Sequence, residues 1–122
     1  MPKQVLLFVP DTILVQVIPD EDLEGFGNCL LDGEILNITV SQQVSNRSAE
    51  FGWGYCGSGV AQLALSILMQ YLPIPLALDH FQEFKFEIVS KWPKAGGTFA
   101  VALGDWVIDK MSSETIVLED GQ

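Results

Sequence analysis

A glycine-rich run is the part of this sequence whose residue types come closest to a ligand-binding motif. Residues 52–57 have the G-x-G-x-x-G spacing of dinucleotide-binding loops, and Asp79 follows roughly twenty residues later. Pyrophosphate binding needs a strand directly before the motif and small residues inside it. Here the preceding residues 41–50 are polar, and the bulky Trp53 and Tyr55 stand between the glycines. We therefore do not expect a dinucleotide at this run.

A cysteine nucleophile is the second chemistry to consider. The run 56–61 resembles the active-site run of papain-like proteases, but in that register Gly59 takes the place of the catalytic cysteine. Cys56 itself would need a base, and His80 is the only histidine of the chain. A predicted helix separates the two residues by on the order of 15 to 20 Å, at about 1.5 Å per residue. We assign no catalytic residue, and the balance of the sequence is against an enzyme.

Metal ligands are sparse in this chain. The single histidine and the two cysteines, Cys29 and Cys56, do not have the spacing of a tetrahedral zinc site. Asp20, Asp22 and Glu24 alternate as in part of a calcium loop, but the glycine and the final glutamate of such a loop are absent. We therefore expect no metal and no cofactor, a solvated acidic loop, and two free thiols.

The composition is that of a globular and strongly acidic protein. The 122 residues are 48% hydrophobic, and sixteen acidic against six basic side chains give a net charge of -10. Such a surface repels phosphate backbones, so we expect no direct nucleic-acid binding. A solvated surface is the expected interpretation of this charge, and attraction for a basic partner or a cation is the alternative. The apolar run 5–9 is too short for the core of a signal peptide, and no segment is long enough to span a membrane. We expect a cytoplasmic protein.

Apolar, β-branched runs predict a sheet in the N-terminal half of the chain. Residues 5–9 and 12–18 read as two strands, separated by a Pro-Asp pair that cannot continue a ladder. An Asp-Gly pair predicts a hairpin between a strand at 29–31 and a longer one at 35–40, in which apolar residues alternate. The polar residues 41–50 then form a loop.

A helical hairpin is predicted to follow. Residues 60–72 are apolar on every face, which is typical of a buried helix. With Gly59 as N-cap, Gln62 can reach back to the cap amide as in a capping box. The second helix begins at Pro75 or after an Asp79 cap. One of its faces carries an apolar stripe, made of Leu78, Phe81, Phe84, Ile88 and Trp92.

The C-terminal part of the chain predicts shorter elements. After a turn at 93–97, residues 98–103 form an extended segment, Asp105 caps a brief helix at 106–111, and 115–118 is a last apolar run.

Together these elements predict a single α+β domain over residues 1–122. An N-terminal antiparallel sheet, from residues 1–40, packs on the glycine turn and helical hairpin of residues 51–92. Trp53 and Tyr55 are expected to fill the gap between the sheet and the helix, with partners for their polar atoms. The alternative is that they are exposed aromatic side chains that recognise a ligand.

The glycine turn and the following helix are similar to an uncharacterised family of small bacterial and phage proteins. The resemblance rests on the run F-G-W-G-Y-C-G-S-G-V-A-Q-L-A at 51–64 and on F-Q-E-F-K at 81–85, and it covers about residues 51–92. Cys56 stands where glycine is usual, and Val60 where proline is usual. The resemblance implies a shared feature without an assigned role, formed by Trp53, Tyr55, Gly57, Ser58, Gly59 and Gln62.

Three functions remain open at this point. The leading expectation is a non-enzymatic interaction or regulatory module that acts through a protein partner or through self-association. The alternative is small-molecule or anion binding by the turn and helix start, Gly52 to Gln62, where backbone amides are free to bind anions. The third is an acidic mimic of nucleic acid that inhibits a basic partner.

Overall fold

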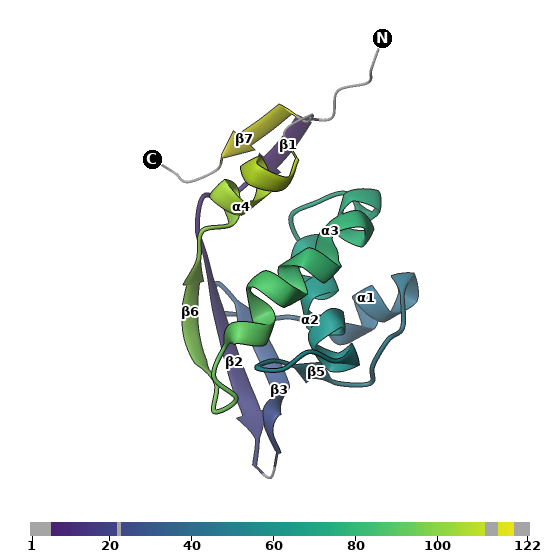
Figure 1. Ribbon diagram of the computed structural model, residues 1–122, viewed down its shortest axis with the longest axis vertical. Coiled ribbons are helices and arrows are strands. Elements are labelled where there is room, and N and C mark those ends of the chain that lie inside the picture. The colour runs from purple at the N-terminus through teal and green to yellow at the C-terminus, as the bar shows by residue number, and fades with distance from the viewer. Residues whose placement is uncertain (1–5, 22, 112–114, 119–122) are drawn as a thin grey trace.

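The protein has an α+β fold in which an antiparallel sheet packs against a helical hairpin, as the sequence predicts (Figure 1). The computed structural model describes residues 6–21, 23–111 and 115–118. Val5 of the first predicted strand and Asp22 of the acidic run lie outside these ranges.

The strands are short except for two at the centre of the sheet. Their bounds are β1 Leu6–Val9, β2 Ile13–Asp20, β3 Leu23–Leu31, β4 Glu34–Ile35, β5 Phe51–Gly52, β6 Gly97–Val101 and β7 Thr115–Leu118. The helices are α1 Ile38–Val44, α2 Ser58–Met69, α3 Ile74–Glu87, the single 3-10 turn η1 Val89–Lys91 and α4 Leu103–Lys110.

The main sheet combines strands from both ends of the chain. Its order is β4-β3-β2-β6, with antiparallel pairing throughout, and β5 adds a short antiparallel pair to β3. β6 is an edge strand from the C-terminal half of the chain. The sequence predicted an extended segment there but did not assign it to this sheet. A separate parallel pair joins β1 to β7.

β2 shows why one face of the sheet is buried. Its residues alternate between buried and exposed: Ile13, Val15 and Val17 are buried, whereas Leu14 and Ile18 point to solvent. The register places Val15 opposite Leu31 and Phe99, so the neighbouring strands continue the same two faces. The helices cover only the buried face (Figure 1).

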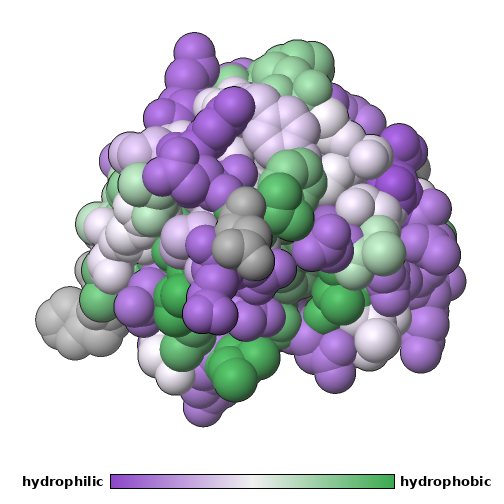
Figure 2. Space-filling model, turned by 90° about the horizontal axis from the view of Figure 1, so that it is seen from below, coloured by the Kyte–Doolittle hydropathy of each residue, from purple (hydrophilic) through white to green (hydrophobic). Residues whose placement is uncertain are grey.

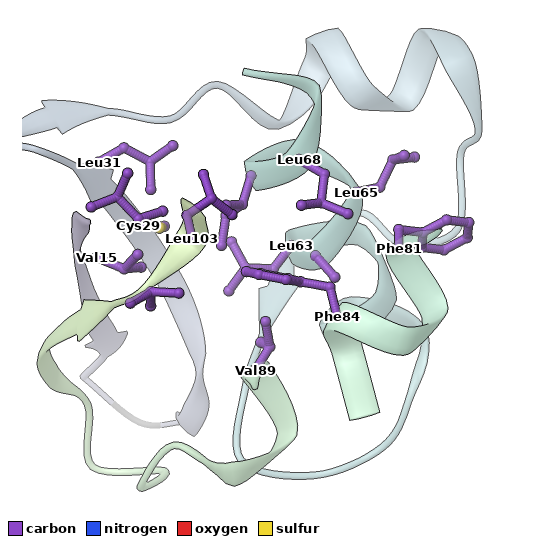
Figure 3. Close-up of a cluster of buried hydrophobic side chains, with 14 of the residues drawn as sticks. Val15, Cys29, Leu31, Leu63, Leu65, Leu68, Phe81, Phe84, Val89 and Leu103 are labelled. Atoms are coloured by element: carbon purple, nitrogen blue, oxygen red, sulfur yellow. The ribbon is translucent and has the colours of Figure 1, made fainter. Parts of the chain in front are cut away.

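The buried helix α2 lies at the centre of the molecule. Residues 59–68 are all buried, which confirms the prediction of a helix that is enclosed on every side. Figure 3 shows Leu63, Leu65 and Leu68 of α2 between Val15 and Cys29 of the sheet and Phe81 and Phe84 of α3. α2 and α3 pack against each other as the expected hairpin.

The second helix begins at Ile74, with Pro73 as N-cap and Pro75 in its first turn, so Asp79 is not its cap. Phe81 and Phe84 of the predicted stripe are buried, but Leu78 is exposed. The predicted stripe also extends beyond the end of the helix. α3 ends at Glu87, and the buried Trp92 lies beyond it, stacked on Phe99 with ring centroids 5.0 Å apart.

The predicted strand at 35–40 and the predicted loop at 41–50 are wrong where they meet, because residues 38–44 form a helix. The Asp-Gly hairpin is present, but its second strand, β4, stops at Ile35. A helix, α1, begins at Ile38, because the Asn37 side chain accepts a hydrogen bond from the Thr39 amide and caps it. The β-branched residues of this segment favoured a strand only by propensity.

Two smaller predictions also need correction. The acidic residues 20–24 are not a loop: β2 runs to Asp20 and β3 resumes at Leu23. α4 begins at Leu103 rather than at Trp106, so Asp105 lies inside its first turn and does not cap it. Among the helices that the structure describes, none is long and apolar enough to cross a membrane.

Candidate functional site

Trp53 anchors the glycine turn to the sheet and to the segment after α3. Its side chain is fully buried, as predicted. The indole N–H donates to the Lys94 carbonyl (3.3 Å), and the backbone amide donates to the Gly25 carbonyl (2.9 Å). Gly25 N in turn donates to the same Lys94 carbonyl at 2.8 Å. The polar edge of this tryptophan is therefore hydrogen-bonded inside the fold.

Tyr55 is half-buried and lies across the glycines of the turn. A Cβ at Gly57 would lie 2.6 Å from the Tyr55 ring, and a Cβ at Gly52 would lie 2.7 Å from its hydroxyl oxygen. The ring also packs on Phe26, with centroids 5.3 Å apart. Burial, and then the nearby Glu50 carboxylate, raise the pKa of Tyr55. These glycines leave room for an aromatic side chain of the protein itself.

The start of α2 differs from the prediction. Gly57, not Gly59, is the N-cap, and its φ of -163° is extended backbone that any residue adopts. Gly59 is helical, so neither of these two glycines has a positive φ. The positive φ of this turn belongs to Gly54, at 82°. Ser58 is the first residue of the helix and is exposed.

Gln62 does not form the predicted capping box. It is fully buried, and its carboxamide joins α2 to the segment that follows α1. Oε1 accepts hydrogen bonds from the amides of Arg47 (2.7 Å) and Ser48 (3.0 Å). Nε2 donates to Ser41 Oγ (2.8 Å) and to the Ser45 carbonyl (3.1 Å). All four bonding positions of the side chain are therefore occupied.

The reactive side chains of the sequence are not assembled into a catalytic group. His80 Nδ1 is 2.7 Å from Glu83 Oε1 on its own helix, α3, whereas Cys56 is an exposed free thiol before α2. Cys29, the other free thiol, is buried, and burial raises its pKa to about 12. In the described part of the chain, no three His, Cys, Asp or Glu side chains are grouped as metal ligands.

The six candidate residues thus form a structural junction. Tyr55 covers Gly57 and Gly59, while Trp53 and Gln62 each connect to a different part of the chain. A short strand, β5, does precede the G-x-G-x-x-G run, but the helix starts only after it, and aromatic side chains fill the turn. The Glu50 carboxylate that acts on Tyr55 disfavours a bound anion at this helix start.

Two surface cavities lie elsewhere, and none of the six candidate residues lines either one. The smaller, of about 150 Å³, lies beside β3, α1 and Phe51. The larger, of about 370 Å³, lies between the β3–β4 hairpin and the end of α2. It is lined by Leu31, Asp32, Glu34, Ile35, Leu36, Gln70 and Tyr71.

The residues of the larger cavity were missed because they are far apart in the sequence. The acidic residues of the Asp-Gly hairpin carried a signal, but nothing in the sequence placed this hairpin beside the C-terminal end of α2. Burial, then the Asp32 carboxylate and then Cys29, raise the pKa of Tyr71 to about 12. The negative charge of Asp32 therefore acts on the phenol across this cavity.

The model of a family of unknown function, DUF6166, matches residues 19–118. This chain belongs to that family. No curated protein and no solved structure matches it. The match starts in β2 and ends in β7, so it includes the whole glycine turn and all four α-helices.

Proposed function

We propose that this member of the DUF6166 family is a non-enzymatic interaction module that binds a protein through the uncovered face of its main sheet. The observation that carries the proposal is the exposure of large apolar side chains on a sheet face that none of the described helices covers. The glycine turn then has a structural role, because it holds α2 against the opposite face.

The uncovered face combines apolar side chains from neighbouring strands. Leu14 is 51%, Ile18 42% and Ile35 76% exposed. Directly paired residues of antiparallel strands share a face. Ile35 pairs with Leu30, and Leu30 pairs with Gln16, which lies on the same face of β2 as Leu14 and Ile18. Large apolar side chains gathered on one face of a sheet are typical of a surface that contacts another protein.

The charge around this face selects the chemistry of the partner. The strands β2, β3, β4 and β6 contain no lysine or arginine. Their ends and turns carry five exposed carboxylates, on Asp20, Glu21, Glu24, Asp32 and Glu34. An apolar patch with an acidic rim complements a surface in which apolar side chains are surrounded by lysine and arginine. A second copy of this acidic chain fits the rim less well.

The molecule seen from below presents the same mixture. Figure 2 shows hydrophobic patches separated by hydrophilic side chains around the end of the molecule where the β2–β3 turn lies.

A double variant of the face tests the proposal. Leu14→Thr/Ile18→Thr keeps the β-propensity of β2 but removes apolar area from the exposed side. Ile74→Gln/Leu78→Gln is the matched control, because it removes exposed apolar area from α3, on the covered side of the sheet. Each tagged protein is incubated with extract of the source cells, and proteins retained by the parent are then purified and titrated by calorimetry.

The expected result is a protein that binds the parent and the α3 control with similar affinity and binds the face variant at least tenfold more weakly. Its binding should also weaken as salt rises, because the rim is charged. A purified partner that binds the face variant as tightly as the parent would refute the proposed surface. Circular dichroism and urea melts establish that each variant is folded.

A further inference from the structure

The cavity between the β3–β4 hairpin and the end of α2 has a strongly negative environment. Asp32 and Glu34 line it, and none of its lining residues is basic. α2 ends at Met69, directly before the lining residues Gln70 and Tyr71, and its last turn contains no basic residue. The C-terminal end of a helix carries partial negative charge, so it adds to the field of the two carboxylates.

The cavity also has walls that suit a long side chain. Its volume of about 370 Å³ falls within the range of roughly 300 to 1,000 Å³ that ligand pockets occupy. Leu31, Ile35 and Leu36 supply apolar surface for a methylene stem. The half-buried Tyr71 also lines the cavity, and an aromatic ring attracts a cation that lies over its face.

The position of one carboxylate is fixed by the fold. Asp32 Oδ1 accepts a hydrogen bond from the Leu14 amide at 2.9 Å, and the Asp32 backbone has a φ of 48°. Over the described residues, Asp32 Oδ2 accepts no hydrogen bond, so it is available to a donor from outside. The bond to Leu14 also connects the cavity to the uncovered sheet face.

We propose that this cavity binds an arginine or lysine side chain of the protein partner. The inference rests on the proposed function, since Ile35 both lines the cavity and belongs to the uncovered sheet face. An arginine fits the combination of acceptors, aromatic ring and apolar wall, because its planar guanidinium stacks on rings and donates to carboxylates. A bare metal ion fits it less well, because Asp32 and Glu34 are the only carboxylates that line the cavity, and the described residues group no three His, Cys, Asp or Glu side chains as metal ligands.

Small probes test the cavity without the partner. Backbone amide resonances are followed by NMR while N-acetyl-arginine amide is added, and the isosteric, neutral N-acetyl-citrulline amide serves as the matched probe. The cationic probe should shift the resonances of residues 31–36 and of Gln70 and Tyr71 with millimolar affinity. The neutral probe should bind at least fivefold more weakly.

Two variants check which carboxylates act. Asp32→Asn/Glu34→Gln keeps hydrogen-bond acceptors but removes both charges, and it should weaken the cationic probe about five- to tenfold. Glu24→Gln, a carboxylate on β3 that lines neither cavity, should leave its affinity unchanged. The amide spectra of the variants report directly whether the fold is intact.

The inference is overturned if both probes bind equally, or if the double variant binds the cationic probe as the parent does. Tighter binding of the free diamine putrescine, by tenfold or more over N-acetyl-arginine amide, would also overturn it by assigning the cavity to a small amine. None of these outcomes bears on the proposed interaction module, whose test depends on Leu14 and Ile18. Conversely, if Leu14→Thr/Ile18→Thr does not weaken binding of the protein partner, the binding of the probe to the cavity is unaffected.

Discussion

Trp53 is the single residue whose replacement is expected to affect stability most. Its side chain is fully buried and its indole N–H bonds the Lys94 carbonyl. Trp53→Ala should lower the free energy of unfolding by about 3 to 5 kcal/mol, a large share of a total of about 5 to 15 kcal/mol. Urea melts of the variant and the parent measure this difference.

Phe86→Ala is the control for Trp53, because Phe86 is an exposed aromatic side chain on α3. It should change stability by no more than about 0.5 kcal/mol. If the Trp53→Ala melt overlaid the parent melt, Trp53 would be a surface anchor and the glycine turn would again be the place to look for a ligand.

The two thiols should differ sharply in reactivity. Cys56 is exposed, whereas Cys29 is buried and burial raises its pKa to about 12, so Cys29 has very little thiolate at neutral pH. The native protein should take up one equivalent of maleimide at Cys56, and the urea-unfolded protein should take up two. Mass spectrometry counts the adducts.

Cys56→Ser is the matched variant for this labelling. It should remove the fast adduct and leave stability within about 0.5 kcal/mol of the parent, because the residue is exposed. Rapid labelling of Cys29 in the folded variant would contradict its buried position.

The same burial predicts a loss of stability in alkaline solution. The pKa of Cys29 is raised in the folded state from 9.0 to about 12, so the folded protein holds this proton when the unfolded chain has lost it. The contribution is fully present below pH 9 and is lost as pH rises toward 12. The stability difference between the parent and Cys29→Ala should therefore shrink above pH 9, by up to about 1.4 kcal/mol per pH unit. A constant difference between urea melts at pH 8 and about pH 10.5 would contradict this.

At the scale of elements, Gln62 determines how the segment after α1 sits on α2. Gln62→Leu would leave the part-buried amides of Arg47 and Ser48 without their acceptor, at a cost of about 1 to 3 kcal/mol for the two together. Amide hydrogen exchange at these two residues should become faster than at the strands of the sheet. Urea melts and exchange measured by NMR give the two quantities.

Gln42→Ala is the comparison for Gln62, since the Gln42 side chain makes one hydrogen bond, to the Ser48 carbonyl at 2.8 Å. Its loss should cost only about 0.5 to 1.5 kcal/mol. Equal effects of the two variants would mean that the four bonds of Gln62 do not act as a unit.

The elements that the sequence predicted correctly are those in which pattern and burial agree. Residues 60–68 are apolar on every face and are buried, and β2 alternates as its exposed and buried faces require. In α1 the two signals disagree. Ile38 and Val40 favour a strand, but the Asn37 cap and the hydrogen bond between Ser41 and Ser66 stabilise a helix against α2.

The sequence predicted which residues belong to the candidate site but not the contacts that they make. The sequence identified Gly57, Gly59 and Gln62, and all three are buried or crowded, but their reasons differ from those expected. Gly57 is required by the closeness of the Tyr55 ring, and Gly59 by the closeness of the Glu50 and Gly52 backbone. Gln62 bonds residues fourteen or more positions away. Contacts between distant segments have no periodic pattern in a sequence, and the cavity beside Asp32 and Tyr71 was missed for the same reason.

At the scale of the whole molecule, the main sheet has one face that the helices cover and one that they leave exposed, and its strands share the excess of acidic over basic side chains. Sixteen acidic and six basic side chains give -10 in total, and the strands of the main sheet contribute acidic residues but no basic ones. Self-association through the uncovered face would bring the acidic rims of two copies together. Binding of a basic partner would instead neutralise the rim.

These two kinds of association must therefore respond to salt with opposite signs. Screening reduces repulsion between like rims, so a homodimer should strengthen as salt rises from about 10 to 300 mM, a range over which the Debye length falls from about 30 Å to below 8 Å. A complex with a basic protein should weaken over the same range. We expect sedimentation equilibrium at tens of micromolar to show a monomer at low salt. If the parent dimerises more at high salt and the face variant Leu14→Thr/Ile18→Thr does not, the dimer forms through the uncovered face. A dimer that is stable at low salt in both proteins would place self-association on another surface.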